Sequence, residues 1–516
     1  MKSINREDYI KEFDKLIKVY SKKFGNVNIT RDWWRKNTKY TEATCNSLFG
    51  NFSTFKDIAM SKSSVRKRET SEIKAKSVSY KCSYFVTSVV EGAKLNNNFL
   101  KAIDTFCKNT NSKRVLLWTR GVKPKDVFTP EQFELFGTDL VTEFSFNDKL
   151  KAKDFMLYPA QMQPLCGLSR FGNRDASLII ASTKQHMTSV PRAKGTRPHT
   201  MWSTGTASIP QYSPTRAGSL AYQDNTTGGL IVEVEDNKRF YIRPVQFKDG
   251  GFIDLGTKYR SDGKVEKGIQ AEAIVWGDLH LTEEDTLAVR ASIEQTNTMK
   301  AKAVMVHDVC SWNSVNHHEQ NNCIINKGES VWTLNDDYNY TAKQLDYILS
   351  KLITADLFIV KSNHDLWVKK WVNAGNFLKD KNNSITGAEA FIDFCNGVDP
   401  IEKNVKRGMK LRDRCHFLKH EQSFNVAGYE LGQHGENGAN GSRGTIKGIG
   451  RAHDKIVIGH SHSPNIFYSA IQVGTNSELE LPYAHGASSW MHANCVIYPN
   501  GTYQLITFID EKWRLK

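Results

Sequence analysis

Short apolar runs that end in turns recur along the C-terminal half of this chain. The first reads AIVWGDLHL from Ala273 to Leu281, with four mostly apolar residues before Gly277. A short apolar run of this kind is typical of a buried strand. Asp278 and His280 follow it, and positions i and i+2 of an extended backbone face the same way. A carboxylate and an imidazole would therefore converge at the carboxyl end of the strand, where open α/β sheets place their ligands.

The same arrangement returns four times further along the chain. Apolar runs begin at Ala303, Ala355, Gly428 and Lys455, and each ends in a turn that carries oxygen or nitrogen ligands. The side chains in these turns are Asp308, then Asn363, His364 and Asp365, then His434, and finally His460 and His462. Imidazole, carboxylate and amide groups together suit a divalent metal ion. Five such turns in one segment predict a metal site.

The order D-x-H, aspartate, N-H-D, H-G and G-H-S-H resembles the calcineurin-like metallophosphoesterases over roughly residues 270–510. The resemblance implies two divalent ions, of which manganese is the favoured metal and magnesium, iron and zinc are alternatives. It implies two overlapping sets of ligands, which are Asp278, His280, Asp308 and His462 for one ion and Asp308, Asn363, His434 and His460 for the other. Asp308 would bridge the ions. The resemblance also implies a catalytic pair, in which His364 protonates the leaving group and Asp365 orients it.

Two positions depart from the pattern of that family. A glycine usually precedes the bridging aspartate, and this chain has His307 there. A second glycine usually precedes the Asn-His pair, and this chain has Ser362. Neither change removes a ligand. They would alter the geometry of the two turns, or His307 would contact a substrate.

The first 60 residues predict a small helical module. Apolar residues recur at helical spacing up to residue 26, and Thr30 and Thr41 are placed to cap two further helices. A last helix is expected from Phe52 to Met60. The segment from Phe49 to Ala59 resembles the small repeats found beside homing endonuclease domains, which implies contact with DNA. The residues expected near DNA are Arg35, Lys36, Lys39, Thr41 and Thr44, together with Arg66, Lys67 and Arg68 in a basic linker at 61–81.

Residues 82–268 predict a smaller α/β domain. The runs CSYFVTSVV, NNNFLKAIDTFCKN and RVLLWT indicate a strand, a helix and a second strand that pairs in parallel with the first. SLIIAS adds a strand, and a hairpin is expected to turn at Asp236–Asn237. The run between Val190 and Ala217 predicts a long ordered surface loop. Its cations are either solvated or in contact with phosphate; they are Arg192, Lys194, Arg197 and Arg216.

Three weaker candidates lie in the C-terminal region. His317 and His318 follow Asp308 closely and would either contact a substrate or lie in an exposed loop. His485, in YAHGASSW, is expected to be structural. The segment from Leu366 to Lys419 is largely helical and basic, and it would form either a cap over the site or a solvated face.

The distribution of charge along the chain predicts a polyanionic partner. The chain of 516 residues carries a net charge of +15, and residues 1–80 hold 18 Lys and Arg against 9 Asp and Glu. This asymmetry favours a polyanionic partner, most simply nucleic acid, over a basic tail that serves solubility. No apolar run is long enough for a bilayer and no signal peptide core is visible, so we expect no membrane partner and a cytoplasmic location. The nine scattered cysteines lack CxxC spacing and are expected to be reduced.

The predicted fold is therefore α/β, with a C-terminal calcineurin-like β-sandwich flanked by helices at 269–516. The smaller α/β domain and the helical module precede it. The predicted function is hydrolysis of DNA by a metal-activated hydroxide, and the layout is similar to the host-DNA-degrading early proteins of large tailed phages, which would act in the host cytoplasm. A phosphatase or phosphodiesterase that acts on protein or small nucleotides is the alternative, and a non-catalytic DNA-binding scaffold is a third. The oligomeric state, including a homo-oligomer, stays open.

Overall fold

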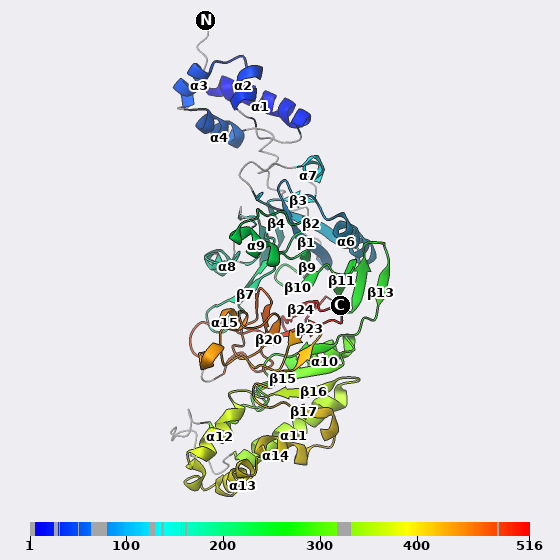
Figure 1. Cartoon of the computed structure of the whole chain (residues 1–516), viewed down its shortest axis with the longest axis vertical. Helices are drawn as coiled ribbons and strands as arrows, with labels where there is room; N and C mark the ends of the chain where they lie inside the picture. The colour runs from blue at the N-terminus through cyan, green and yellow to red at the C-terminus, as the bar shows by residue number, and fades with distance from the viewer. Residues whose placement is uncertain are drawn as a thin grey trace.

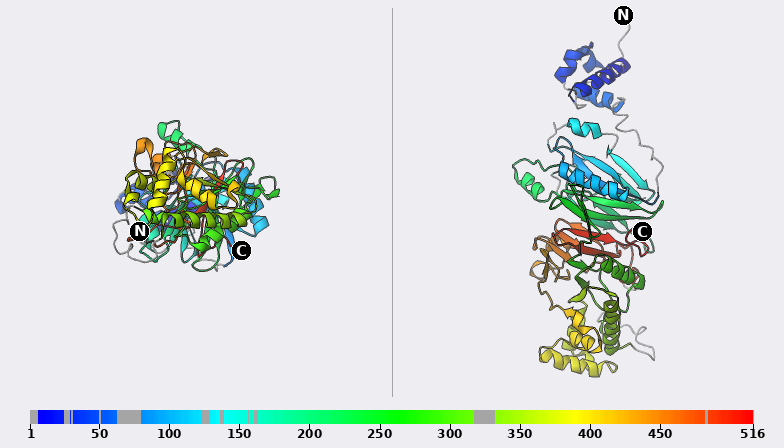
Figure 2. Two further views of the ribbon diagram at one scale, coloured as in Figure 1. Left: turned by 90° about the horizontal axis from the view of Figure 1, so that it is seen from below. Right: turned by 90° about the vertical axis from the view of Figure 1, so that its right-hand side faces the viewer.

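The computed structural model describes residues 6–24, 29, 31–49, 51–62, 80–122, 129–135, 139–155, 157, 159, 163–174, 176–316, 332–481 and 484–515. Within them the chain is an α/β protein with sheets of five, three, six and ten strands. The molecule is elongated, with the N-terminal helices at one end and helices α11 to α14 at the other (Figures 1 and 2). The predicted α/β class is confirmed.

The N-terminal module is a cluster of four helices with a core of its own. Tyr9 and Phe13 of the first helix meet the ring of Phe55 edge to face, with ring centroids 5.7 and 5.4 Å apart. All the buried hydrophobic residues of this core come from residues 9–59, so the module does not need the rest of the chain to cover it. The helices are α1 (Arg6–Phe24), α2 (Arg31–Asn37), α3 (Glu42–Phe49) and α4 (Phe52–Lys62).

A five-stranded sheet follows, in the order β10-β9-β1-β2-β3. Strands β1 (Cys82–Val90) and β2 (Lys113–Thr119) pair in parallel across α6 (Asn97–Thr110), as the alternating pattern predicts. Strands β9 (Gly228–Val234) and β10 (Phe240–Gln246) form the expected hairpin. The fifth strand is β3 (Leu140–Val141), and a separate three-stranded sheet contains β11 (Gly251–Asp254), β12 (Thr257–Arg260) and β13 (Val265–Lys267).

The ten-stranded sheet combines strands from both sides of the boundary expected near Gly268. Its order is β18-β19-β20-β22-β21-β7-β8-β6-β5-β4. Before the boundary its strands are β4 (Glu143–Asn147), β5 (Leu150–Lys153), β6 (Ser177–Ile180), β7 (Met187–Val190) and β8 (His199–Ser203). After it they are β18 (Asn425–Val426), β19 (Tyr429–Glu430), β20 (Ile456–Ile458), β21 (Asn465–Phe467) and β22 (Ala470–Gln472). How the chain divides into folding domains stays a prediction.

Strand β8 corrects the prediction of an uninterrupted loop between Val190 and Ala217. Every residue of β8 is buried, and Trp202 is fully enclosed. The neighbouring Pro, Gly and Ser residues favoured a loop, but pairing with β6 and β7 overrides this local signal. Thr204 to Ser208, which follow β8, are buried as well, and the run ends in the first residues of the short helix α9 (Arg216–Gln223).

The six-stranded sheet has the order β17-β16-β15-β14-β23-β24, in which β14 to β17 are parallel. Alternate residues of its strands enter two different cores: Ile274 packs toward the helices, and Val275 packs toward the ten-stranded sheet. The strands are β14 (Ala273–Val275), β15 (Ala303–His307), β16 (Asp356–Val360), β17 (Cys415–Phe417), β23 (Ala493–Ile497) and β24 (Tyr503–Thr507).

Helices cover the outer face of this sheet. The buried faces of α10 (Thr286–Thr298) and α11 (Leu334–Lys351) belong to the same hydrophobic core as Ile274. The segment from Leu366 to Lys419 is largely helical, as predicted, and consists mainly of α12 (Asp365–Asn373), α13 (Ser384–Cys395) and α14 (Pro400–Gly408). The described residues contain no helix with the length and apolarity that a bilayer crossing requires.

Candidate metal centre

The predicted ligands lie at the carboxyl ends of five strands in two different sheets. Asp278 and His280 follow β14, Asp308 follows β15, and Asn363 follows β16. From the ten-stranded sheet, His434 follows β19, and His460 and His462 follow β20. Backbone hydrogen bonds join these turns, since the His280 amide donates to the Asp308 carbonyl at 2.7 Å and the Gly459 amide donates to the His434 carbonyl at 2.8 Å.

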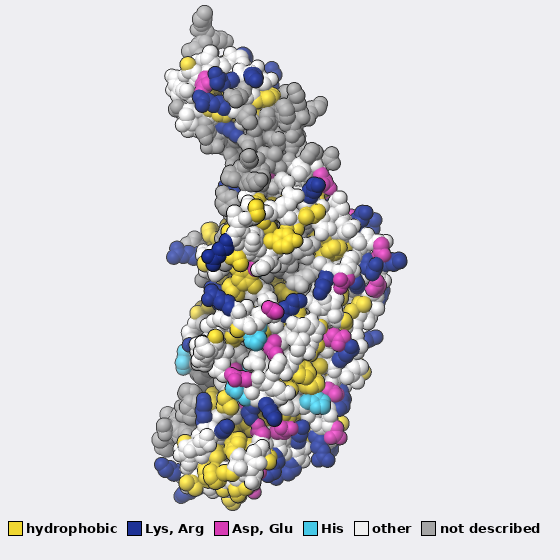
Figure 3. All heavy atoms as spheres, in the orientation of Figure 1, with side chains coloured by type: hydrophobic (Ala, Val, Ile, Leu, Met, Phe, Trp, Pro, Cys, Tyr) yellow, Lys and Arg dark blue, Asp and Glu magenta, His cyan; other side chains and the backbone are white. Residues whose placement is uncertain are grey.

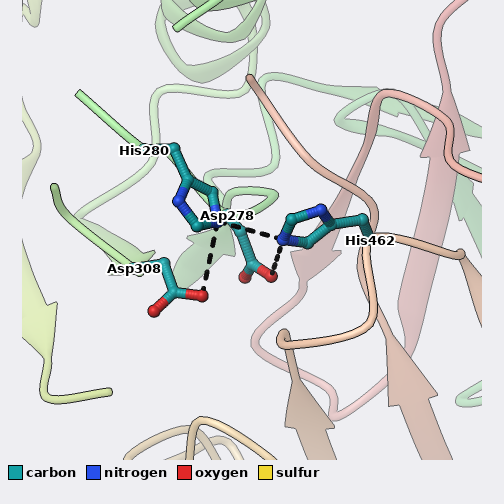
Figure 4. Close-up of side chains that lie close together, drawn as sticks. All are labelled: Asp278, His280, Asp308 and His462. Atoms are coloured by element: carbon teal, nitrogen blue, oxygen red, sulfur yellow. Dashed lines mark hydrogen bonds and ion pairs between the residues drawn. The ribbon is translucent and has the colours of Figure 1, made fainter. Parts of the chain in front are cut away.

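The four residues predicted for the first ion lie together. Figure 4 shows Asp278, His280, Asp308 and His462 pointing toward one another. Their ligand atoms all lie within 4.8 Å of each other, and all four residues are buried. The Nε2 atoms of His280 and His462 are 3.0 Å apart, and His462 Nε2 lies 3.2 Å from Asp278 Oδ2. This spacing leaves the four donors facing one common point that could hold a cation.

Asp308 lies between the two predicted ligand sets. Its Oδ2 is 3.4 Å from His280 Nε2 and 3.2 Å from His434 Nε2. His434 Nε2 is in turn 3.1 Å from Asn363 Oδ1. Asp308, Asn363 and His434 thus form a second group beside the first, with a single carboxylate oxygen facing both.

Two further histidines lie beside His434. The ring centroid of His460, the fourth predicted member of the second set, lies 5.1 Å from that of His434, and the His460 backbone amide donates to Asp278 Oδ2 at 2.7 Å. The His307 ring centroid lies 5.5 Å from that of His434, and its Nδ1 lies 3.4 Å from His434 Nδ1. Asp278, His307 and His434 also have ligand atoms within 4.8 Å of one another. The sequence marks His307 only as a departure from the family pattern, and its place against His434 comes from the tertiary structure.

Buried polar atoms without partners indicate what the site is built to hold. Asp278 Oδ1, Asp308 Oδ1 and His307 Nε2 are enclosed and make no hydrogen bond with protein groups. Isolated buried charges are costly unless they are paired or bind a metal. A Cβ atom at Gly459 would come within 2.1 Å of Asp278 Oδ1, so glycine is required where the chain passes this carboxylate. The donors fit a divalent cation.

The ligand turns carry unusual backbone conformations. His280, Asp308, His460 and His462 have φ angles of 47°, 42°, 75° and 58°. Left-handed backbone costs a residue with a Cβ atom roughly 1–2 kcal/mol. Such strain persists where the surrounding structure imposes it, and it clusters at functional sites. Four strained residues in one cluster therefore support a functional rather than a purely structural origin.

The electrostatics of the cluster suit a cation. Burial would raise the pKa of Asp308, but the imidazoles of His434, His364 and His280 hold it well below its usual range. Burial would also lower the pKa of His434, but Asp308 and Asp278 outweigh it and raise this pKa to about 10. Burial lowers the pKa of His280 to about 3. Two buried carboxylates thus keep their charge, and without a metal a proton on His434 compensates part of it.

His364 lies beside the first group of ligands. Its ring centroid is 4.8 Å from that of His280, and its ring stacks on Trp367 at 3.9 Å. Asp365, the next residue, accepts hydrogen bonds from Trp312 Nε1 at 2.8 Å and from the Ser362 amide at 2.9 Å. Its orientation of His364 stays a prediction.

The group within reach of His364 is the backbone carbonyl of Ser311, at 3.4 Å from His364 Nδ1. The Ser311 hydroxyl also lies 3.2 Å from His280 Nδ1 and donates to Glu283 Oε2 at 2.5 Å. Ser311 therefore contacts both a predicted ligand and the predicted acid. Nothing in the sequence pattern distinguishes Ser311 or Glu283, because their importance arises only when the turns meet.

The predicted DNA contacts of the helical module lie on its surface. Arg35, Lys36 and Lys39 are exposed, and the face of the module seen in Figure 3 carries a cluster of Lys and Arg side chains. Arg35 Nε lies 3.3 Å from Glu42 Oε2. The Thr41 hydroxyl caps α3 by accepting from the Thr44 amide at 3.2 Å, as predicted. Arg66, Lys67, Arg68, His317 and His318 lie outside the described residues.

Comparison with known proteins gives one informative similarity. No family model matches the chain. The chain is 31% identical to Protein A1 of Escherichia phage T5 over 367 residues, which are 65% of this chain and 64% of that protein. The chain thus spans less than two thirds of this relative.

Proposed function

We propose that this chain is a phosphodiesterase that uses two divalent metal ions and that its substrate is DNA. Manganese is the metal that we favour. The observation that carries the proposal is the position of Asp308, whose single Oδ2 atom faces His280 on one side and His434 on the other. A carboxylate shared in this way between two sets of ligands is typical of sites with two metal ions. Magnesium, iron and zinc are alternatives with the same donor set.

The chemistry explains the residue types. Two divalent ions, held by the two sets of ligands that share Asp308, would supply charge to polarise the phosphoryl oxygens and to activate a water at neutral pH. The protein holds the carboxylates and imidazoles in place through the strained turns at the strand ends. Burial excludes bulk water from Asp278 and Asp308, which would strengthen their electrostatic attraction for bound cations.

His364 is placed to protonate the leaving group. If its Nδ1 carries the hydrogen and donates to the Ser311 carbonyl, its Nε2 is left to exchange a proton with a substrate oxygen. The stacking of the ring on Trp367 limits its rotation. We propose that protonated His364 donates from Nε2 to the oxygen that leaves phosphorus, as a general acid.

DNA is the proposed substrate for three reasons. The N-terminal module has its own core and presents exposed cations. Residues 1–80 hold 18 Lys and Arg against 9 Asp and Glu, a surplus of 9 out of the net charge of +15, and such charge promotes sequence-independent contact with phosphates. The relative is a phage protein, and a phage-encoded nuclease would act in the cytoplasm of the host.

The test is a digestion assay on gels. Circular and linear DNA, single- and double-stranded, would be incubated with the purified chain and manganese, magnesium or zinc. We expect degradation with manganese that EDTA abolishes. Hydrolysis of p-nitrophenyl phosphate with intact DNA would instead favour a phosphatase or a small-nucleotide phosphodiesterase. DNA binding without hydrolysis under any metal would favour a scaffold.

A further inference from the structure

A cavity of about 600 Å³ adjoins the metal centre. One wall is the segment Ala484–His492, and the loop Ala193–Pro198 forms another part of the lining. The sequence marks both segments, as the YAHGASSW motif and as the basic loop run, and the proposed chemistry uses neither. Two backbone hydrogen bonds between Arg192 and Ser488, of 2.9 and 2.8 Å, join the walls. The cavity is therefore formed before any ligand arrives, as ligand sites usually are.

One side of the cavity packs against His462, a predicted ligand of the first ion. The Trp490 ring, which lines the cavity, lies 4.3 Å from the ring of His462. The Met491 amide donates to the His462 carbonyl at 3.1 Å, and the Ser489 and Ser463 hydroxyls are 2.7 Å apart. A ligand in the cavity would therefore lie immediately beside a phosphate at the metal centre.

The side chains that line the cavity favour a nucleobase over a phosphate as its ligand. Trp490, Leu479 and Phe508 offer aromatic and apolar surface. The carboxylates of Glu480, Asp510 and Glu511 line the same space. Carboxylates repel phosphate but accept hydrogen bonds from the amino groups of bases, and flat apolar rings stack on tryptophan. Two cations of the loop, Lys194 and Arg197, also line the cavity and suit the sugar-phosphate backbone of the strand.

We propose that this cavity holds one nucleoside of the substrate, next to the phosphate that is cut. The proposal rests on the proposed function and makes it more specific. Hydrolysis of the phosphate would then depend on a neighbouring base that can leave its stack and enter the cavity. Single-stranded ends and unpaired positions offer such a base at a lower cost than intact duplex.

The test is a substitution that fills the cavity and leaves the predicted metal ligands unchanged. Ala487 lines the cavity and is exposed, so Ala487→Phe places a ring in it. The matched control is Ala217→Phe, at an exposed alanine of α9 outside the cavity. Calorimetry with manganese would measure the affinity of deoxyadenosine 5′-monophosphate and of deoxyribose 5-phosphate, which lacks the base.

We expect Ala487→Phe to weaken binding of the nucleotide about tenfold or more and to leave binding of deoxyribose 5-phosphate unchanged. It should also raise KM for a short single-stranded oligonucleotide, while kcat/KM for methyl p-nitrophenyl phosphate stays within about twofold. The control should match the parent chain in every assay.

Equal affinity of the parent chain for nucleotide and sugar phosphate would overturn the cavity proposal. So would unchanged nucleotide binding in Ala487→Phe, or equal losses on oligonucleotide and small diester. A parent chain that binds the nucleotide through its base but leaves all DNA intact would refute the proposed DNase function alone. The binding assay thus judges the cavity independently of DNA hydrolysis.

Discussion

The Nε2 atoms of His280 and His462 lie 3.0 Å apart, although 182 residues separate them in the chain. At most one hydrogen can lie between two such nitrogens. Each nitrogen also faces a carboxylate, Asp308 at 3.4 Å for His280 and Asp278 at 3.2 Å for His462. When neither nitrogen carries a hydrogen, two lone pairs and two carboxylates are directed at one point, and this arrangement could hold a cation.

Removing the charge of Asp308 should abolish stable metal binding. In Asp308→Asn the shape is retained, but the shared oxygen between His280 and His434 loses its charge. We expect the manganese that remains after dialysis to fall sharply and the rise in Tm caused by manganese to disappear. Elemental analysis and thermal denaturation would measure these effects. The control is Asp262→Asn, an exposed carboxylate beside Arg260; metal retention in Asp308→Asn equal to this control would contradict a bridging role.

His364→Ala should retain metal and lose most turnover. The side chain lies beside His280 without belonging to either cluster of metal donors. Loss of a general acid typically lowers kcat by about 10²–10⁴-fold. Manganese content and the kcat for DNA hydrolysis would be measured on the same preparation. Full activity would remove His364 from the mechanism, and loss of metal would show that it acts on the ligands instead.

Ser311→Ala should weaken metal binding without removing a ligand. The hydroxyl lies 3.2 Å from His280 Nδ1 and donates to Glu283, so it fixes the orientation of the ring. Loss of such a partner typically costs 10–100-fold in metal affinity or activity. A manganese titration would give the affinity. Ser314→Ala is the matched control, because Ser314 donates to Asp337 instead of a residue of the site, and it should leave the affinity unchanged.

The stability of the metal-free chain should be greatest near pH 6.5. The raised pKa of His434, about 10 against 6.5, gives a stabilisation that is full below pH 6.5 and is lost as the pH rises through 10. Burial lowers the pKa of His280 to about 3 and that of His307 to about 4. Below pH 6.5 these two histidines take up protons in the unfolded chain first, so stability falls as the pH falls.

Urea denaturation in EDTA at several pH values would measure this profile, with slopes approaching about 1.4 kcal/mol per pH unit for each proton involved. Manganese affinity should rise with pH between 6.5 and 10, because a metal ion at His434 must displace its proton. A metal affinity that is constant over this range would show that His434 is not a ligand.

Deleting residues 1–80 should weaken DNA binding and spare the hydrolysis of bis(p-nitrophenyl) phosphate. The core of the helical module comes only from residues 9–59, so its removal exposes no other core. Fewer phosphate contacts should also reduce the dependence of DNA affinity on salt. Binding assays at several salt concentrations would show both effects. Unchanged affinity would refute the role given to the module.

The local pattern of the sequence is sufficient for several elements. The helices of the N-terminal module, the pairing of β1 with β2 across α6, and the hairpin of β9 and β10 are all predicted correctly. In each case the apolar spacing and the turn residues lie within one short segment. The carboxylate and imidazole positions of the metal site are visible for the same reason, because each follows an apolar run.

Only the tertiary structure decides what depends on distant pairing. Strand β8 is buried by its neighbours β6 and β7 despite a local composition typical of a loop. His307 reaches His434, and the Ser311 carbonyl lies beside His364, because turns from separate strands meet at one edge. The sequence by itself determined which side chains are available as ligands. Their grouping, and the cavity beside them, follow from long-range contacts between the sheets, which no local pattern encodes.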